Sequence, residues 1–321
     1  MHEHHCSLVG PWHIDDDGDA HAEWGQGWKD IRTLLHRSEH PILLSCENFF
    51  LLLTQPDGQQ KMLEVLGNNA IKIIIYLRRQ DLHLESWYSY TVQNLRETED
   101  IFDSEAYAMA RHVHNYHALL NRLAESFGPE SLIVRVFEPG SFSGGSLCHD
   151  FISAMGLEWS DDFAPPPKRV NKSIDPRLHA LCRAAAKRFD DQNIAQSFVQ
   201  MSQRVSEMLP PKSMVIMPLD KREAYLAKFK ESNAKVAKRF FHRDQLFNDD
   251  IPEGTPTDMN TDVRIHQDTT LSLHEAWYQS TINLGIYDYN NILMQRLNAV
   301  EDSTAWKSIR LTLHKLFHKT R

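Results

Sequence analysis

Two adjacent arginines, Arg78 and Arg79, stand where they could bind an anion. They follow the apolar run Ile71–Leu77, which reads as a buried strand, and they precede a helix-compatible stretch that opens near Asp81. Ligands of open α/β sheets bind at the carboxyl ends of the strands, and a guanidinium group suits a phosphate or sulfate. The hydroxyl of Ser86 follows eight residues after Arg78, in the first turns of the expected helix. The segment therefore predicts a phosphate or sulfate site at a strand end.

Carboxylates follow two other apolar runs that read as strands. Glu47 comes after Pro41–Ser45, and Glu138 comes after Ser131–Phe137. In a parallel sheet these strand ends share one edge with Arg78. A carboxylate beside bound cations can take the proton of a hydroxyl that accepts an anionic group. The spacing alone leaves a structural alternative open, in which Glu47 caps a helix start and Arg78 pairs with Glu47 or Glu138.

Strand-like runs alternate with stretches of helical periodicity, which favours an α/β fold with a parallel sheet flanked by helices. The expected helices are Trp28–Arg37, Phe49–Leu53, Gln60–Leu66, Asp81–Leu95, Ser104–Phe127, Leu147–Met155, Pro176–Phe189, Phe198–Met208 and Glu223–Phe241. The pattern divides the chain into an irregular N-terminal segment (residues 1–28), an α/β domain (29–250) and a helical C-terminal extension (251–321).

Composition limits the partners and the compartment. The net charge of -8 argues against broad nucleic-acid binding, which needs a basic footprint. No apolar run approaches the roughly 20 residues of a membrane span, and the first residues lack the apolar core of a signal peptide. The four cysteines form no C-x-x-C pair, which favours reduced thiols and a cytoplasmic location.

The histidines do not indicate a metal site. The densest internal cluster comprises His112, His114 and His117. On one helix these three side chains point in different directions, so they cannot converge on one metal ion. Solvated or hydrogen-bonded core positions are the expectation, and no metal cofactor is expected.

Several segments carry a resemblance to sulfotransferases. IKIIIYLRRQDLHLESWYSY (residues 71–90) resembles the 3′-phosphate-binding segment of that family, in which a strand ends in arginine and a serine follows eight positions later, as Arg78 and Ser86 do. ILLSCENFF (residues 42–50) is similar to the preceding strand, whose end supplies the catalytic base, and Glu47 occupies roughly that position. Three further segments resemble the bacterial branch of the family: VRVFEPGSFSGGSLCHDFISAMGL (134–157), RVNKSID (169–175) and ESNAKVAKRFFHRDQLF (231–247). The resemblance covers about residues 28–250.

The resemblance implies a P-loop NTPase-like sulfotransferase topology. It also implies transfer of a sulfuryl group from 3′-phosphoadenosine 5′-phosphosulfate (PAPS) to a hydroxyl of a carbohydrate or small metabolite, without a metal. Glu47 would be the base, and Arg78 and Ser86 would hold the 3′-phosphate. Asn171 and Lys172 lie where the family approaches the nucleotide or closes the cleft, and a plain surface loop is the alternative there.

The chain also departs from the family. Sulfotransferases begin with a strand and a phosphosulfate-binding loop of the type H-x-G-x-x-K-T-G-T-T, and these 321 residues contain no such loop. The chain is then either a sulfotransferase that lacks its first strand and loop, or a catalytically degenerate module that still binds a nucleotide or a partner. A P-loop kinase-like phosphotransferase is a further alternative, against which the absence of a G-x-x-x-x-G-K-[ST] loop argues. Arg79 contacts either the nucleotide or a surface carboxylate.

Overall fold

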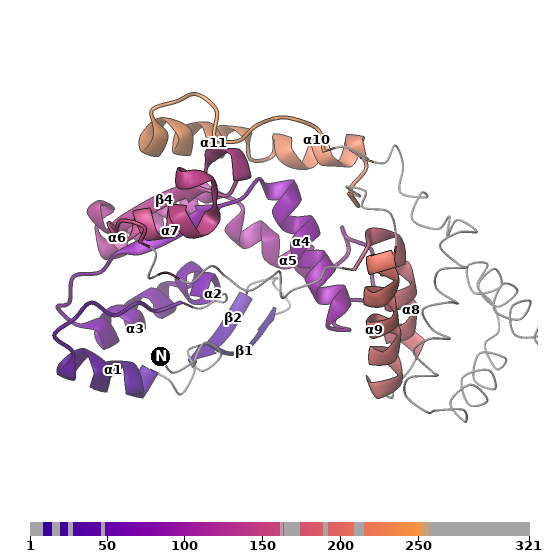
Figure 1. Cartoon of the computed structure of the whole chain (residues 1–321), viewed down its shortest axis with the longest axis horizontal. Helices are drawn as coiled ribbons and strands as arrows, with labels where there is room; N and C mark the ends of the chain where they lie inside the picture. The colour runs from indigo at the N-terminus through magenta and orange to yellow at the C-terminus, as the bar shows by residue number, and fades with distance from the viewer. Residues whose placement is uncertain are drawn as a thin grey trace, which may run out of the picture. The chain divides into compact units, whose positions relative to one another are not determined.

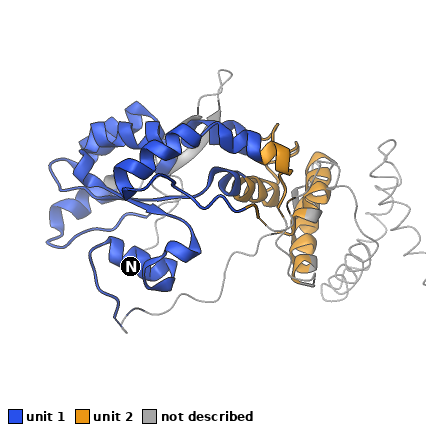
Figure 2. Ribbon diagram, turned by 90° about the horizontal axis from the view of Figure 1, so that it is seen from above, with its two compact units in different colours: residues 1–84, 105–165, 223–250 blue, residues 85–104, 166–222, 251–321 orange. Residues whose placement is uncertain are grey.

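The chain forms two compact units, each assembled from several stretches of sequence (Figures 1 and 2). The computed structural model describes residues 9–14, 20–24, 28–45, 49–160, 163, 174–188, 192–208, 215–252 and 255. The first unit comprises Met1–Leu84, Glu105–Pro165 and Glu223–Asp250, and the second comprises Glu85–Ser104, Pro166–Arg222 and Ile251–Arg321. Two helices, α4 (Gln80–Gln93) and α10 (Leu219–Ala227), each contain a boundary between the units.

A two-stranded parallel sheet lies in the first unit. Strand β3 (Ile73–Leu77) pairs with strand β4 (Leu132–Val136) in a continuous register, from Ile73 opposite Leu132 to Leu77 opposite Val136. Both strands are rich in isoleucine, valine and leucine, which suit a largely buried pleated surface. This small parallel sheet with helices around it confirms the expected α/β class.

The run Pro41–Ser45, expected as a buried strand, is not one. Its backbone pairs with neither of the sheets that the described residues form. Leu43 is 58% exposed, whereas its neighbours Ile42 and Leu44 are half-buried. Such alternation is typical of an extended segment that covers the protein with one side only. The prediction was wrong because a short apolar run does not by itself distinguish a sheet strand from an extended surface segment.

Helices surround the sheet within the first unit. They include α1 (Trp28–Arg37), α2 (Phe49–Thr54), α3 (Pro56–Leu66), α5 (Glu105–Val113), α6 (Tyr116–Phe127), α7 (Leu147–Ala154) and α11 (Lys230–Val236), which continues into a π-helical turn at Ala237–Phe241. The single helix expected over Ser104–Phe127 is two helices. The side chain of Asn115 accepts a hydrogen bond from the Ala118 N–H at 3.1 Å and so caps a new helix start.

The N-terminal residues, expected to be irregular, contain an antiparallel pair. Strand β1 (Val9–Ile14) pairs with strand β2 (Ala20–Trp24). The sequence between them, DDDGD, contains the aspartate–glycine pair that often forms a hairpin turn. The strands escaped prediction because histidine, glycine and proline interrupt their hydrophobic alternation.

The core of the first unit packs the sheet against its helices. Its fully or nearly fully buried side chains include Leu77, Leu132 and Val136 of the sheet, Leu52 of α2, Leu119, Leu120 and Leu123 of α6, and Val236 of α11. A buried leucine or valine contributes about 1.5 to 3 kcal/mol through the apolar surface that it removes from water. The sheet and α6 therefore provide a rigid base for the residues that follow the strands.

A buried carboxylate organises the second unit. Glu85 of α4 accepts hydrogen bonds from the Arg222 guanidinium (2.6 Å) and from the backbone N–H groups of Ile216 (2.9 Å) and Met217 (2.7 Å). Arg222 is 1% exposed, so the pair compensates two charges that have lost water. The unit also contains helices α8 (His179–Arg188) and α9 (Gln192–Met208), which pack against each other.

None of the helices that the structure describes is long and apolar enough to cross a membrane. Apart from residues 251, 252 and 255, the expected helical extension (251–321) lies outside the described residues.

Candidate functional site

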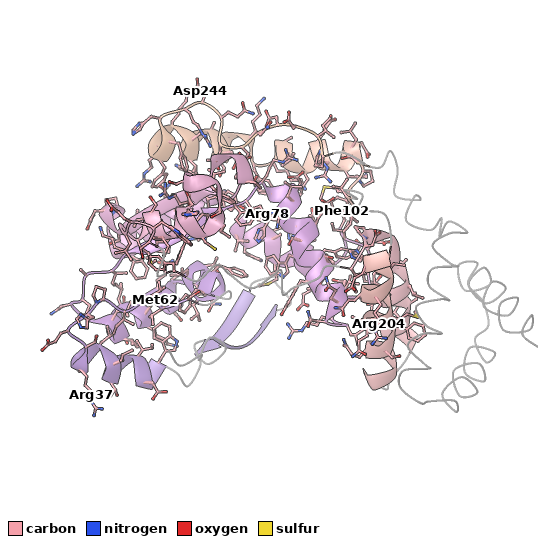
Figure 3. All side chains as sticks on the ribbon, in the orientation of Figure 1. Arg37, Met62, Arg78, Phe102, Arg204 and Asp244 are labelled. Atoms are coloured by element: carbon pink, nitrogen blue, oxygen red, sulfur yellow. The ribbon has the colours of Figure 1, made fainter. Side chains whose placement is uncertain are left out.

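Arg78 is the first residue after β3, at the carboxyl end of the parallel pair (Figure 3). Its carbonyl oxygen accepts a hydrogen bond from the Tyr116 hydroxyl at 2.6 Å. Its guanidinium carbon lies 5.6 Å from the centre of the Phe137 ring, within the range of a cation–π interaction. Arg78 is therefore positioned by two elements, the start of α6 and the end of β4.

Arg79 is a structural residue. It is 6% exposed and forms a two-bond ion pair with the buried Asp81, at 2.8 and 3.0 Å. It also donates hydrogen bonds to the carbonyl oxygens of Asn248 and Asp250, both at 2.7 Å. The interpretation that Arg79 pairs with a surface carboxylate is wrong, because Asp81 is completely buried. Arg79 pairs with the buried carboxylate of Asp81, which lies two residues later in the first turn of α4.

Of the remaining predicted site residues, the structure describes Ser86. Ser86 is exposed on α4 and belongs to the second unit, whereas Arg78 belongs to the first. Glu47, Asn171 and Lys172 lie outside the described residues.

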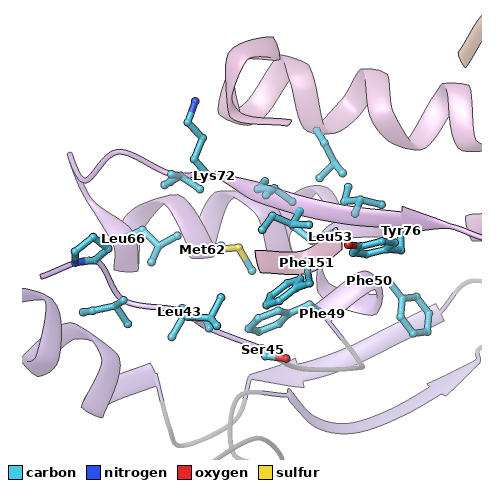
Figure 4. Close-up of a pocket in the computed structure, with 18 of the residues that line it drawn as sticks. Leu43, Ser45, Phe49, Phe50, Leu53, Met62, Leu66, Lys72, Tyr76 and Phe151 are labelled. Carbon is cyan, nitrogen blue, oxygen red and sulfur yellow. The ribbon is translucent and has the colours of Figure 1, made fainter. Parts of the chain in front are cut away.

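A cavity of about 700 Å³ lies beside β3 within the first unit (Figure 4). Most of its lining is apolar and includes Leu53 of α2 and Met62 and Leu66 of α3. Arg78 and His83 add polar groups to the same lining. Small-molecule sites commonly have volumes of about 300 to 1,000 Å³ and a few polar groups in a mostly apolar wall.

Two histidines and a tyrosine form a hydrogen-bonded chain that reaches this cavity. Nδ1 of His83 lies 2.8 Å from Nε2 of His114, and Nδ1 of His114 lies 2.8 Å from the hydroxyl oxygen of Tyr225. His114 is completely buried, as expected for a hydrogen-bonded core histidine.

The Tyr225 hydroxyl can set the direction of these two hydrogen bonds. Among the described residues, His114 is the hydrogen-bond partner of the Tyr225 hydroxyl. If that hydroxyl donates to Nδ1 of His114, then Nε2 of His114 carries the hydrogen and donates to Nδ1 of His83. His83 then carries its own hydrogen on Nε2. In this arrangement His83 is a neutral hydrogen-bond donor in the cavity lining that also contains Arg78.

Both imidazoles are uncharged at neutral pH. Burial, followed by the positive charge of Arg78, lowers the pKa of His83 to about 4. Burial, followed by the neighbouring His83, lowers the pKa of His114 well below its usual value. The positive charge of this part of the cavity therefore comes from the arginine and not from the histidines.

A buried carboxylate fixes another part of the cavity wall. Tyr76 of β3 donates a hydrogen bond to Asp150 of α7 at 2.6 Å, and Asp150 accepts another from the Ser143 N–H at 2.9 Å. Nε of Arg135 in β4 lies 3.5 Å from the same carboxylate. Burial and the hydrogen bond to Asp150 raise the pKa of Tyr76, so its hydroxyl stays protonated and structural.

A cation beside a neutral imidazole can bind an anionic group. The sequence predicts the arginine at the strand end but not the histidine chain, because the contacts of His114 with His83 and Tyr225 span 31 and 111 residues of sequence. Only a weak indication is visible in the sequence: His83 lies in the same segment as Arg78, on a helix that begins at Gln80.

Within the described residues, no group of three or more His, Cys, Asp and Glu side chains is arranged to hold a metal ion.

Comparison with known proteins identifies one distant relative. No protein-family model and no solved structure matches the chain. A curated protein of Archaeoglobus fulgidus, described as an uncharacterized protein, is 24% identical over 191 residues. The match covers 56% of this chain and 49% of the archaeal protein, so the chain spans about half the length of that relative. The description of the relative names no activity, and the functional assignment rests on the residues of this chain.

The two adjacent arginines should respond differently to truncation. Arg79→Ala leaves the carboxylate of Asp81 buried without its cation, and we expect it to lower the free energy of unfolding by about 3 to 5 kcal/mol. Arg78→Ala should lower it by less than about 1 kcal/mol, because the contact with Tyr116 is made by the backbone. Urea denaturation followed by circular dichroism measures both. Equal effects of the two substitutions would show that Arg78 is also a structural residue.

Acid should destabilise the protein before its carboxylates titrate. In the unfolded chain both His83 and His114 take up a proton near pH 6.5, whereas in the folded protein their pKa values lie lower. Their contribution to stability is therefore complete above about pH 6.5 and is lost as the pH falls toward 4, by up to about 1.4 kcal/mol per histidine per pH unit.

Urea denaturation between pH 7.5 and 4.5 measures this loss. His83→Gln should reduce the slope, and His36→Gln, a change at an exposed position, should not. A free energy of unfolding that stays constant down to pH 5 would contradict the neutral, buried state of the pair.

Proposed function

We propose that the chain binds the 3′-phosphate of an adenosine 3′,5′-bisphosphate nucleotide at Arg78, and that it is a PAPS-dependent sulfotransferase. The observation that carries the proposal is the position of Arg78: it follows a parallel strand directly and lines a cavity. Carboxyl ends of parallel strands are where open α/β proteins bind ligands. Arg79 has its hydrogen-bond donors committed to Asp81 and to two carbonyl groups, so Arg78 is the arginine of the pair assigned to the ligand.

The surroundings of Arg78 favour an anion. Helix α4 starts two residues later, and the N-terminal end of a helix carries partial positive charge. The negative charge of Asp81 in that first turn is compensated by Arg79. The neutral imidazole of His83 lines the same cavity. Together these groups suit a phosphate that must be held without a metal.

The proposed reaction is a direct displacement. The acceptor hydroxyl attacks the sulfur of PAPS, the bond from sulfur to the bridging phosphate oxygen breaks, and adenosine 3′,5′-bisphosphate leaves with the electron pair. Glu47 takes the hydroxyl proton as general base. Ser86 contributes a second contact to the 3′-phosphate, and Asn171 and Lys172 close over the nucleotide. The acceptor is a hydroxyl of a carbohydrate or a small metabolite.

A second candidate function is nucleotide binding without catalysis. The observation that favours it is the absence, from these 321 residues, of the glycine- and lysine-containing loop that would hold the 5′-phosphosulfate. In that case Arg78 keeps its role and Glu47 has none. Binding and turnover separate the two functions.

Calorimetry with adenosine 3′,5′-bisphosphate tests the shared part of the proposal. We expect the protein to bind it, and Arg78→Ala to weaken binding by about 10- to 100-fold, since a hydrogen bond to a charged group contributes about 1.5 to 3 kcal/mol. Arg37→Ala, at an exposed position at the end of α1, is the control and should bind normally. If the unchanged protein does not bind, or if Arg78→Ala binds equally well, Arg78 is not a phosphate ligand.

Transfer of ³⁵S from labelled PAPS tests the catalytic part. Monosaccharides and 4-nitrophenol serve as acceptors. We expect Glu47→Gln to abolish transfer and to leave the affinity for adenosine 3′,5′-bisphosphate unchanged, because amide and carboxylate have similar shapes but the amide is not a base. Transfer that persists in Glu47→Gln excludes Glu47 as the base. Binding without transfer in the unchanged protein favours the non-catalytic function.

A further inference from the structure

One edge of β3 has no strand beside it within the described part of the chain. β3 pairs with β4 along its other edge, where the Leu77 carbonyl accepts a hydrogen bond from the Phe137 N–H at 2.7 Å. In a strand, the N–H and C=O of one residue point to the same edge, and successive residues alternate. Because Leu77 faces β4, Ile74 and Tyr76 direct their backbone groups toward the opposite edge.

The cavity follows this edge. Eight consecutive residues, Ile71 to Arg78, line it, although successive side chains of a strand point to opposite faces. No residue of β4 contributes to the lining. A space that touches every residue of one strand and none of its partner lies along the edge of the sheet and not over one face. All five residues of the extended segment Pro41–Ser45 also line the cavity (Figure 4).

The space has the size of a short strand. A residue in a sheet rises about 3.3 Å along the strand, lies about 4.8 Å from the next strand and spans about 10 Å between layers, which gives about 160 Å³. The cavity of about 700 Å³ therefore holds about four residues of extended chain. β3 itself has five residues.

The lining selects a peptide over a hydrocarbon. Apolar side chains come from α3 (Met62 and Leu66) and from α6 (Leu119 and Leu123), which favours an occupant with apolar side chains. A hydrocarbon chain would also fill this space, but it would cover the backbone groups of β3 without giving them hydrogen-bond partners. Burial of an amide without a hydrogen-bond partner is unfavourable. An added strand fills the space and pairs the same groups.

Arg78 sets the direction of the added strand. It lines the cavity and follows the last residue of β3. A strand parallel to β3 brings its carboxyl end to this arginine, whereas an antiparallel strand brings a positively charged amino end or an uncharged backbone. We propose that the cavity along β3 binds the C-terminal residues of an apolar peptide as an added parallel strand, with the terminal carboxylate at Arg78. Main-chain pairing then gives affinity and the carboxylate gives direction.

A fluorescein-labelled peptide, KKGSVIVL with a free C-terminal carboxylate, tests the proposal by fluorescence anisotropy. We expect it to bind, and its C-terminal amide to bind about tenfold more weakly. In the Arg78→Ala protein the free acid should fall to the affinity of the amide. The same peptide with its two valines and its isoleucine N-methylated keeps its apolar surface but cannot pair with a strand, and we expect it not to bind. No binding by KKGSVIVL, or equal binding by the N-methylated peptide, overturns the proposal.

Two further measurements separate this proposal from others. Dodecanoate, an anionic hydrocarbon, should not displace the peptide at stoichiometric concentration; displacement together with insensitivity to N-methylation would identify an acyl-chain site instead. Ile42→Trp fills the cavity from the half-buried Pro41–Ser45 side and should abolish peptide binding. Circular dichroism checks that this variant folds, and the N-methylated peptide tests the unchanged protein independently. The proposal does not rest on sulfuryl transfer, so it can hold where the nucleotide experiments fail.

Discussion

One buried guanidinium organises the region on which the candidate site depends. Arg79 joins the end of β3, the first turn of α4 through Asp81, and the carbonyl groups of Asn248 and Asp250, which lie about 170 residues further along the chain. A charge can be buried at this depth only when its hydrogen-bonding groups are paired. Because Arg79 fixes the turn between strand and helix, the neighbouring Arg78 has a defined position at the sheet edge. The position of the proposed ligand-binding arginine therefore depends on the structural arginine that follows it in the chain.

The elements that could be predicted from the sequence are those with strong local patterns. The strands Ile73–Leu77 and Leu132–Val136 and the helix Gln80–Gln93 lie close to the ranges expected for them, because long apolar runs and helical periodicity reflect burial directly. The misjudged elements lack such a signal. Pro41–Ser45 is apolar but covers the protein with alternate residues only, and the break at Asn115 depends on a single capping side chain.

In the candidate site, too, some features follow from local sequence and others do not. The position of Arg78 after a strand follows from local sequence, and so does the presence of a second arginine beside it. The different roles of the two arginines do not, because the partners of Arg79 include a segment distant in sequence. The hydrogen bonds from His83 through His114 to Tyr225 likewise join helix α4, the turn between α5 and α6, and helix α10, and no periodicity within one of these elements reveals them. Long-range contacts of this kind become visible only in three dimensions.

Because the two histidines are uncharged, any pH dependence of anion binding at this site must come from the ligand. Arg78 keeps its charge at all physiological pH values, and His83 and His114 remain neutral well below pH 6. The protein thus offers a counter-charge that is constant across the range in which cells operate. A phosphate monoester, by contrast, gains its second negative charge near pH 6. Affinity would then follow the ionisation of the ligand, and the site would distinguish a dianionic phosphate from a monoanionic ester by electrostatics alone.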